Sequence, residues 1–306
     1  GTNHQYMMFF TQKGKVFWMR VYEIPEGGKN TKGRAMQNLI NIEPDDSVKA
    51  FLVTQDLKDE EYINSHYVIM ATKKGQVKKT SLEQYSRPRT NGINAITIRE
   101  GDELLSAKLT TGDSQVMLAL ASGKSIRFEE AKTRPMGRTA SGVRGITLQH
   151  ENDEVIGMVA VNDMESNILV VSEKGYGKRS KLEDYRITNR GGKGVKTLNI
   201  SEKTGNLVAI KNVDDSNDLM IINKSGLTIR MAVEDLRVMG RATQGVRLIK
   251  IKEDDSIAAV AKVMHEDEEV ESEDENLENL EATDTNSEDE TENGTDVEND
   301  TEGNIE

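Results

Sequence analysis

The feature that most constrains the fold is an internal repeat marked by two columns of glycine. Five times an apolar run meets a turn that ends in glycine, and a second glycine follows 19 residues later in four repeats and 17 later in the other. The first glycines lie 61, 48, 52 and 51 residues apart. Two phased columns predict five copies of one structural unit. The glycine pairs are Gly14 and Gly33, Gly75 and Gly92, Gly123 and Gly142, Gly175 and Gly194, and Gly226 and Gly245.

Each repeat is predicted to hold four short strands. In the third repeat, a hairpin flanks Gly123, an alternating strand follows Gly142, and an acidic turn leads to an apolar strand over residues 155–161. Four strands in about 50 residues, without long helical periodicity, are typical of propeller blades. The predicted fold is therefore all-β, a β-pinwheel or propeller-like ring of about six four-stranded blades. Five blades are visible, the first incomplete, and residues before Gly1 are expected to complete a sixth.

Charge divides the chain into two predicted domains. Residues 265–306 hold 20 of the 53 Asp and Glu residues and none of the 40 Lys and Arg, so residues 1–264 carry a net charge of +7 (40 against 33). We predict a pinwheel domain over 1–264 and a disordered acidic tail over 265–306. The tail is either a solubilising appendage or a competitor of a polyanion for the basic body. No run is apolar and long enough for a membrane helix, which favours a cytoplasmic protein.

Basic residues align in three columns when the repeats are superposed on their glycines. The columns lie four residues after the first glycine, four before the second (three in the second repeat), and two after the second. Equivalent positions in a ring share one radius, so the columns predict a belt of positive charge; the alternative is exposed charge that serves solubility alone. The columns contain Lys79, Arg127, Arg179 and Arg230; Lys29, Arg89, Arg138, Arg190 and Arg241; and Arg144, Lys196 and Arg247.

A curved belt of cations suits the evenly spaced phosphates of duplex DNA. Aromatic residues make up only 4% of the chain, which argues against single-strand binding by stacking. There is no cysteine, the four histidines are scattered, and the sequence around Gly123-Lys124-Ser125 lacks the first glycine of a phosphate-binding loop. No cofactor is therefore expected in this chain. Tyr22, Tyr85 and Tyr185 are interpreted as packing residues.

Several segments resemble the C-terminal domain of the bacterial DNA gyrase A subunit. They include residues 17–25 (FWMRVYEIP), 175–179 (GYGKR), 136–144 (MGRTASGVR) and 239–247 (MGRATQGVR), and the resemblance covers about residues 5–264. It implies a six-bladed β-pinwheel that wraps DNA in one chiral sense, so that an ATP-dependent topoisomerase introduces negative supercoils. It also implies a gyrase B subunit that binds ATP and Mg²⁺, a second A subunit in an A2B2 heterotetramer, and a chromosome-associated enzyme whose catalytic tyrosine lies outside this chain.

One motif departs from that family pattern. The family's gyrase box reads Gln, basic, Arg, Gly, Gly, basic, Gly and belongs to the first blade. Here Arg190, Gly191, Gly192, Lys193 and Gly194 match its last five positions, but Thr188 and Asn189 precede them, and they lie in the fourth repeat. These five residues join the predicted DNA-binding set. The alternatives are a propeller scaffold that binds proteins and the related domain of the topoisomerase IV A subunit.

Overall fold

The computed structural model describes residues 2–27, 33–252 and 254–265, and the chain divides into two units after His265. The first unit is the repeat region. The predicted disordered tail, apart from His265, lies outside the described residues. No helix in the described residues is long and apolar enough to cross a membrane.

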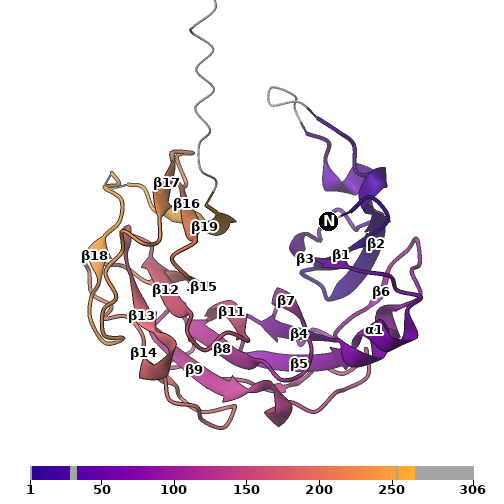
Figure 1. Ribbon diagram of the computed structural model, residues 1–306, viewed down its shortest axis with the longest axis horizontal. Coiled ribbons are helices and arrows are strands. Elements are labelled where there is room, and N and C mark those ends of the chain that lie inside the picture. The colour runs from indigo at the N-terminus through magenta and orange to yellow at the C-terminus, as the bar shows by residue number, and fades with distance from the viewer. Residues whose placement is uncertain (1, 28–32, 253, 266–306) are drawn as a thin grey trace, which may run out of the picture. The chain divides into compact units, whose positions relative to one another are not determined.

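The described residues form five small antiparallel sheets, one for each repeat, which follow one another in an arc (Figure 1). From the inner to the outer strand, blade 1 is β3 (Val48–Thr54), β1 (Tyr6–Thr11), β2 (Lys15–Arg20) and β6 (Ile93–Asn94), and blade 2 is β7 (Leu104–Thr110), β4 (Tyr67–Thr72), β5 (Gln76–Ser81) and β10 (Val143–Arg144). Blade 3 is β11 (Val155–Val161), β8 (Gln115–Leu120), β9 (Lys124–Glu129) and β14 (Val195–Lys196), and blade 4 is β15 (Leu207–Val213), β12 (Asn167–Ser172), β13 (Tyr176–Lys181) and β18 (Val246–Arg247). Blade 5 is β19 (Ile257–Met264), β16 (Asn217–Asn223) and β17 (Thr228–Ala232).

The helical elements are short. The α-helix α1 (Glu60–Ser65) occupies the insertion that lengthens the first interval, and the Asp59 carboxylate caps it by accepting from the backbone N–H groups of Glu61 and Tyr62. Five 3-10 turns follow strands or connect them: η1 (Val21–Glu23), η2 (Met36–Asn38), η3 (Leu82–Tyr85), η4 (Glu130–Lys132) and η5 (Leu182–Asp184).

The outermost strand of each four-stranded blade comes from the next repeat along the chain. Val143 of the third repeat pairs with Val77 of the second, and Val195 of the fourth pairs with Ser125 of the third. The prediction of an all-β blade array is confirmed, but the expectation that each repeat forms its own four-stranded blade is wrong. Blade 5 has three strands in the described part of the chain, because no further repeat supplies its outer strand there.

The hairpin turns explain both the first glycines and the acidic turns. Gly75 adopts φ +83°, and a Cβ there would lie 2.9 Å from the Ile146 carbonyl oxygen, so the position requires glycine. The acidic turn then folds back on the hairpin: an Asp102 carboxylate oxygen accepts from the backbone N–H of Lys74 at 2.8 Å. Asp46, Asp153 and Asp255 make the equivalent bond in their own repeats.

Apolar side chains fill the spaces between neighbouring blades. Ile69 and Ala71 of blade 2, for example, pack with Val116 and Leu118 of blade 3. Tyr85 and Tyr185 are buried as predicted, whereas Tyr22 is 61% exposed. The inner strands β3, β7, β11, β15 and β19 line the inside of the arc, which leaves the exchanged outer strands on its rim (Figure 1).

Candidate nucleic-acid interface

Four segments, which we call straps 2 to 5, carry the exchanged strands around the rim. They are residues 86–98, 133–148, 185–200 and 236–251, each holding the second glycine of its repeat. Each strap lies along the third strand of the preceding blade. In strap 3 the Met136 N–H donates to the Lys79 carbonyl at 2.8 Å, and the Gly145 N–H donates to the Gly75 carbonyl at 2.8 Å. The strap is thus fixed at both ends of β5.

Consecutive straps also bond to one another. The Thr97 hydroxyl in strap 2 donates to the Thr139 carbonyl in strap 3 at 2.7 Å, and the Thr147 hydroxyl in strap 3 donates to the Gly191 carbonyl in strap 4 at 2.7 Å. The Asn199 N–H in strap 4 donates to Thr243 in strap 5. The straps therefore form one hydrogen-bonded strip along blades 1 to 4, which we call the strap rim.

The strap rim is uniformly basic. Its four segments contain thirteen Lys or Arg residues and not one Asp or Glu. All thirteen are exposed or half-exposed. Because the straps hold no Asp or Glu, no carboxylate within them neutralises these cations. They are Arg87, Arg89, Arg134, Arg138, Arg144, Arg186, Arg190, Lys193, Lys196, Arg237, Arg241, Arg247 and Lys250.

The predicted second and third columns meet in this strip. The Arg190 guanidinium donates to the backbone carbonyl of Arg144 at 3.1 Å, and the Arg241 guanidinium donates to that of Lys196 at 2.8 Å. Each bond joins one strap to the strap before it, and Arg138 reaches Asn94 in the same way at 3.4 Å. The acceptors are neutral carbonyls, so the arginines keep their net charge while their positions are fixed. Arg89 is exposed, and Lys29 lies outside the described residues.

Arg247, the last of the third column, is oriented by an aromatic side chain. Its Nε and Nη2 atoms lie 3.2 and 2.8 Å from the Tyr176 hydroxyl, and its guanidinium carbon lies 5.4 Å from the ring centroid. Lys196 of the same column donates to the Asn199 side chain at 3.3 Å and is exposed. Arg144 is exposed as well.

A fourth column of arginines was missed in the sequence. Arg134, Arg186 and Arg237 lie eleven residues after the first glycine of their repeats, and Arg87 lies twelve residues after its own. All four are exposed at the start of a strap. Their guanidinium groups make no hydrogen bond or ion pair with any residue that the structure describes. The same alignment on the first glycine would have revealed them.

The first column differs from the expected belt. Lys79, Arg127 and Arg179 are only 4%, 8% and 7% exposed, because the next strap covers the strand that carries them. Lys79 pairs with the fully buried Glu130 at 3.0 Å and lies over the Tyr67 ring. The expectation that these three residues lie on the surface is wrong.

These buried cations instead connect consecutive repeats. Arg127 donates to the carbonyls of Leu182 and Tyr185 in the next repeat, at 2.6 and 2.9 Å. Arg179 likewise donates to the carbonyls of Leu236 and Glu234 in the next repeat, and it pairs with Asp215 in the turn between the two repeats. Arg230 has no strap over it and keeps 39% side-chain exposure, although it pairs with Asp218 at 2.7 Å.

The glycine-rich segment of strap 4 lies close against strap 3. Gly191 adopts φ +83°, and its N–H donates to the Gly145 carbonyl at 2.6 Å. The Thr147 N–H donates to the Gly192 carbonyl at 2.9 Å. Gly192 and Lys193 are exposed, so backbone and charge are both accessible at this point of the rim. At Gly194 a Cβ would lie 2.5 Å from the Ser125 carbonyl oxygen.

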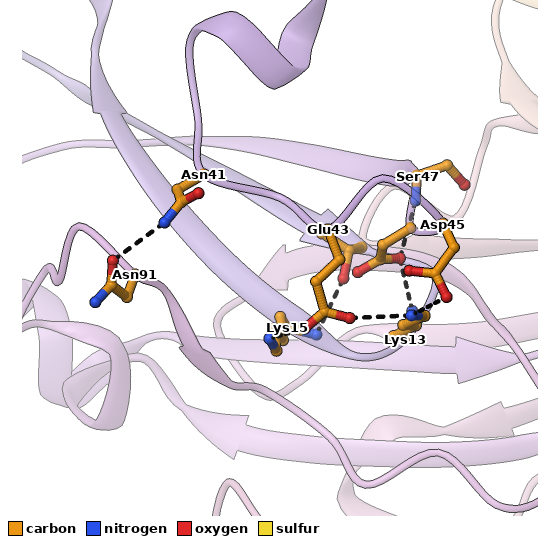
Figure 2. A network of polar contacts seen from close by, with 9 residues as sticks. Lys13, Lys15, Asn41, Glu43, Asp45, Ser47 and Asn91 are labelled. Carbon is orange, nitrogen blue, oxygen red and sulfur yellow. Dashed lines mark hydrogen bonds and ion pairs between the residues drawn. The ribbon is translucent and has the colours of Figure 1, made fainter.

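The hairpin turn of blade 1 has a different electrostatic character. Figure 2 shows Glu43 and Asp45 beside the two lysines of the turn: Glu43 lies 2.6 Å from Lys15 and 3.0 Å from Lys13, and Asp45 lies 2.6 Å from Lys13. The bonds from Lys15 and Lys13 lower the pKa of Glu43 to about 2. The two lysines are thus neutralised locally, in contrast to the strap cations.

Comparison with known proteins supports the repeat assignment. The model of the DNA gyrase C-terminal domain, a β-propeller, matches residues 5–55, 66–111, 121–162, 166–214 and 217–264. The DNA gyrase A subunit of Staphylococcus aureus (strain NCTC 8325) is 43% identical over 275 residues, which cover 90% of this chain and 30% of that protein. The Staphylococcus epidermidis subunit is 43% identical over 268 residues, 87% of this chain and 30% of that protein. The chain thus spans about a third of these relatives.

Solved structures show the same fold. The C-terminal domain of DNA topoisomerase IV superposes with a TM-score of 0.77 at 23% identity, covering 86% of this chain and 80% of that one. The DNA gyrase A C-terminal domain superposes with a TM-score of 0.73 at 22% identity, covering 86% and 84%.

Proposed function

Because this chain belongs to the DNA gyrase C-terminal domain family, we propose that its strap rim binds duplex DNA and wraps it around the blades. The observation that supports this most directly is the strip of thirteen cations without one carboxylate. The strip follows the outside of an arc, as a bent phosphate backbone does. Bending a 20–30 bp site by 40–90° costs about 1–6 kcal/mol, and regularly spaced phosphate contacts offset that cost.

Binding is proposed to depend little on base sequence. The cations lie on straps that contain turns and two-residue strands but no helix. The single α-helix in the described residues, α1, has six residues and belongs to an insertion rather than to a strap. Base-edge readout in the major groove usually uses a helix or a two-stranded ribbon that enters the groove. Phosphate contacts fix the position of the DNA without reading its sequence.

In the whole protein, the wrapped segment is proposed to serve a type IIA topoisomerase that introduces negative supercoils at the expense of ATP, in which two A and two B subunits form an A2B2 assembly on the chromosome. ATP and Mg²⁺ are assigned to the partner B subunit. Among the described residues, no group of three His, Cys, Asp or Glu side chains is placed to hold a metal ion. This chain by itself is proposed to bind and bend DNA without cleaving it.

Two measurements test the proposal. The first is duplex affinity as a function of salt: about ten neutralised phosphates predict that log K falls against log salt with a slope near −9. A slope shallower than about −3 would contradict a phosphate-binding rim. The second is ligation of nicked circular DNA in the presence of the protein, where chiral wrapping shifts linking number in one direction. Tight binding with an unshifted distribution would retain binding and exclude wrapping.

The A-subunit domain of topoisomerase IV remains the second candidate, since its structure superposes with a TM-score of 0.77. The linking-number shift per bound protein separates the two, because the topoisomerase IV domain resembles this one but is expected to wrap DNA less. The strongly basic rim argues against a scaffold that only binds proteins.

A further inference from the structure

Lys178 is fully buried inside blade 4, yet its ammonium group reaches the strap on the outside. Its Nζ lies 2.7 Å from the Gly240 carbonyl, 2.6 Å from the Arg241 carbonyl, and 3.0 Å from both the carbonyl and the hydroxyl of Thr243. All four oxygens belong to strap 5. An ammonium has three protons to donate, so these oxygens can use its full capacity.

Lys78 occupies the same position in blade 2, three residues after the first glycine. It is also fully buried, and its Nζ lies 2.6 Å from the Ala95 carbonyl in strap 2 and 2.5 Å from the Arg138 carbonyl in strap 3. The Tyr85 hydroxyl donates to the same Ala95 carbonyl at 3.0 Å. This lysine therefore connects two straps at once.

The other repeats carry apolar residues at this position. They have Phe17, Ile126 and Ile229. Ile126 is 2% exposed and lies beneath strap 4, where a Cβ on Gly192 would be 3.5 Å from its side chain. Strap 4 is held from outside instead, by the bonds of Gly191 to strap 3. The chain therefore contains a natural comparison between straps with and without an internal amine.

The buried amines are costly, which argues that they do more than fill space. Burial lowers the pKa of Lys178 to about 8, and burial together with Arg138 lowers the pKa of Lys78 to about 7. Ile126 shows that an apolar side chain fits the same position. The carbonyls that the amines bind include those of Arg138 and Arg241, whose side chains then reach the preceding strap. The hydrogen bond from the buried amine thus fixes the position of the backbone that carries an interface arginine.

We propose that Lys78 and Lys178 are positioning residues for DNA binding, each fixing from inside the blade the strap that presents Arg138 or Arg241 to phosphate. The DNA-binding part of this inference rests on the proposed function. The fixing of the strap does not, because it can be measured without DNA.

The test compares Lys178→Met with the matched variant Ile126→Met in the full chain. Amide exchange of strap 5 is followed at Met239 and Leu248, which donate to the Arg179 and Gly175 carbonyls. The equivalent amides of strap 4, at Thr188 and Thr197, serve as the internal reference. Lys178→Met is expected to speed exchange in strap 5 by about tenfold and to leave strap 4 unchanged, since local opening reports the loss of local contacts. Ile126→Met should alter neither strap.

Duplex DNA supplies the second readout. Lys178→Met is expected to weaken binding and to make the salt slope shallower by about one for each phosphate that is no longer neutralised. Faster exchange in strap 5 with unchanged affinity and slope would overturn the positioning role. Failure of the wild-type chain to bind DNA would overturn the proposed function, while the exchange comparison would still decide whether the amine fixes the strap.

A measurement on the wild-type chain guards against variants that do not fold. Side-chain ¹⁵N spectra should show slowly exchanging Nζ protons from buried, hydrogen-bonded lysines. If every lysine Nζ exchanges at the rate of an exposed amine, the buried contacts do not persist in solution and the inference fails.

Discussion

Neutralising the fourth column provides the sharpest test of the interface. The variant Arg134→Gln, Arg186→Gln and Arg237→Gln removes three exposed guanidinium groups, one from each of straps 3, 4 and 5. None bonds to another described residue, so folding should be unaffected. Each neutralised phosphate contributes about 0.9 to the salt slope, so the slope should become shallower by about 2.7. The ratio of the wild-type affinity to the variant affinity should therefore be about 40-fold smaller at 200 mM salt than at 50 mM salt.

The matched control changes the same net charge on the inside of the arc. Lys49, Lys108 and Lys262 are exposed on the inner strands β3, β7 and β19, and all three are replaced by Gln. Affinities are measured by fluorescence anisotropy on one labelled duplex at four or more salt concentrations. The control should change the slope by much less than one. If it flattens the slope as much as the rim variant does, DNA responds to net charge alone and the strap rim is not the interface.

Four further outcomes are expected. Gly142→Ala should destabilise the fold by about 1–3 kcal/mol in urea unfolding, because Gly142 has φ +85° and its Cβ would lie 2.5 Å from the Val77 carbonyl oxygen, whereas Gly137→Ala meets nothing within 4 Å. Lys79→Met leaves the buried Glu130 carboxylate without its cation and should cost about 3–5 kcal/mol. Arg230→Met should cost less, because Arg230 is 39% exposed and the buried Asp218 keeps its contact with His265 at 2.8 Å. The pKa of Lys178 is lowered from 10.5 to about 8 by burial, with Asp184 and Arg241 as the charged groups that act on it, so between these pH values the unfolded state binds more protons than the folded state. The free energy of unfolding should therefore rise by at most about 3 kcal/mol from pH 8 to pH 10.5. Chemical denaturation of Lys178→Met should show no such rise. Deleting residues 265–306 should tighten DNA binding more at low salt than at high salt, because salt screens the repulsion between the acidic segment and DNA. If the chains with and without these residues bind DNA equally well at each salt concentration, the segment serves solubility alone.

The repeat was predictable because glycine reports local backbone geometry. A hairpin with φ +83° at Gly75 needs no information from elsewhere in the chain, and its recurrence gave the number of repeats. Strand partners are not local. The residues around Val143 alternate as a strand should, but the local sequence does not indicate that Val143 pairs with Val77 rather than with a strand of its own repeat.

The same distinction explains the basic columns. Arg190 and Arg241 lie on the straps themselves, so their accessibility follows from the strand pattern around them. Lys79 and Arg127 belong to strands that a later segment covers, and their burial depends on the exchange that the sequence did not reveal. A cation at a regular interval therefore indicates an equivalent place in the array, and only the packing of the next repeat decides whether it meets water or a carbonyl.

The exchanged outer strand also separates the unit of duplication from the unit of structure. A gene segment that encodes one whole repeat, inserted within the array, gives its outer strand to the blade before it and receives one from the repeat after it. Such an insertion leaves no blade without its outer strand, and neither does the deletion of an internal repeat. Arrays of different length can thus arise by single recombination events, each of which moves the rim cations by one complete step around the arc.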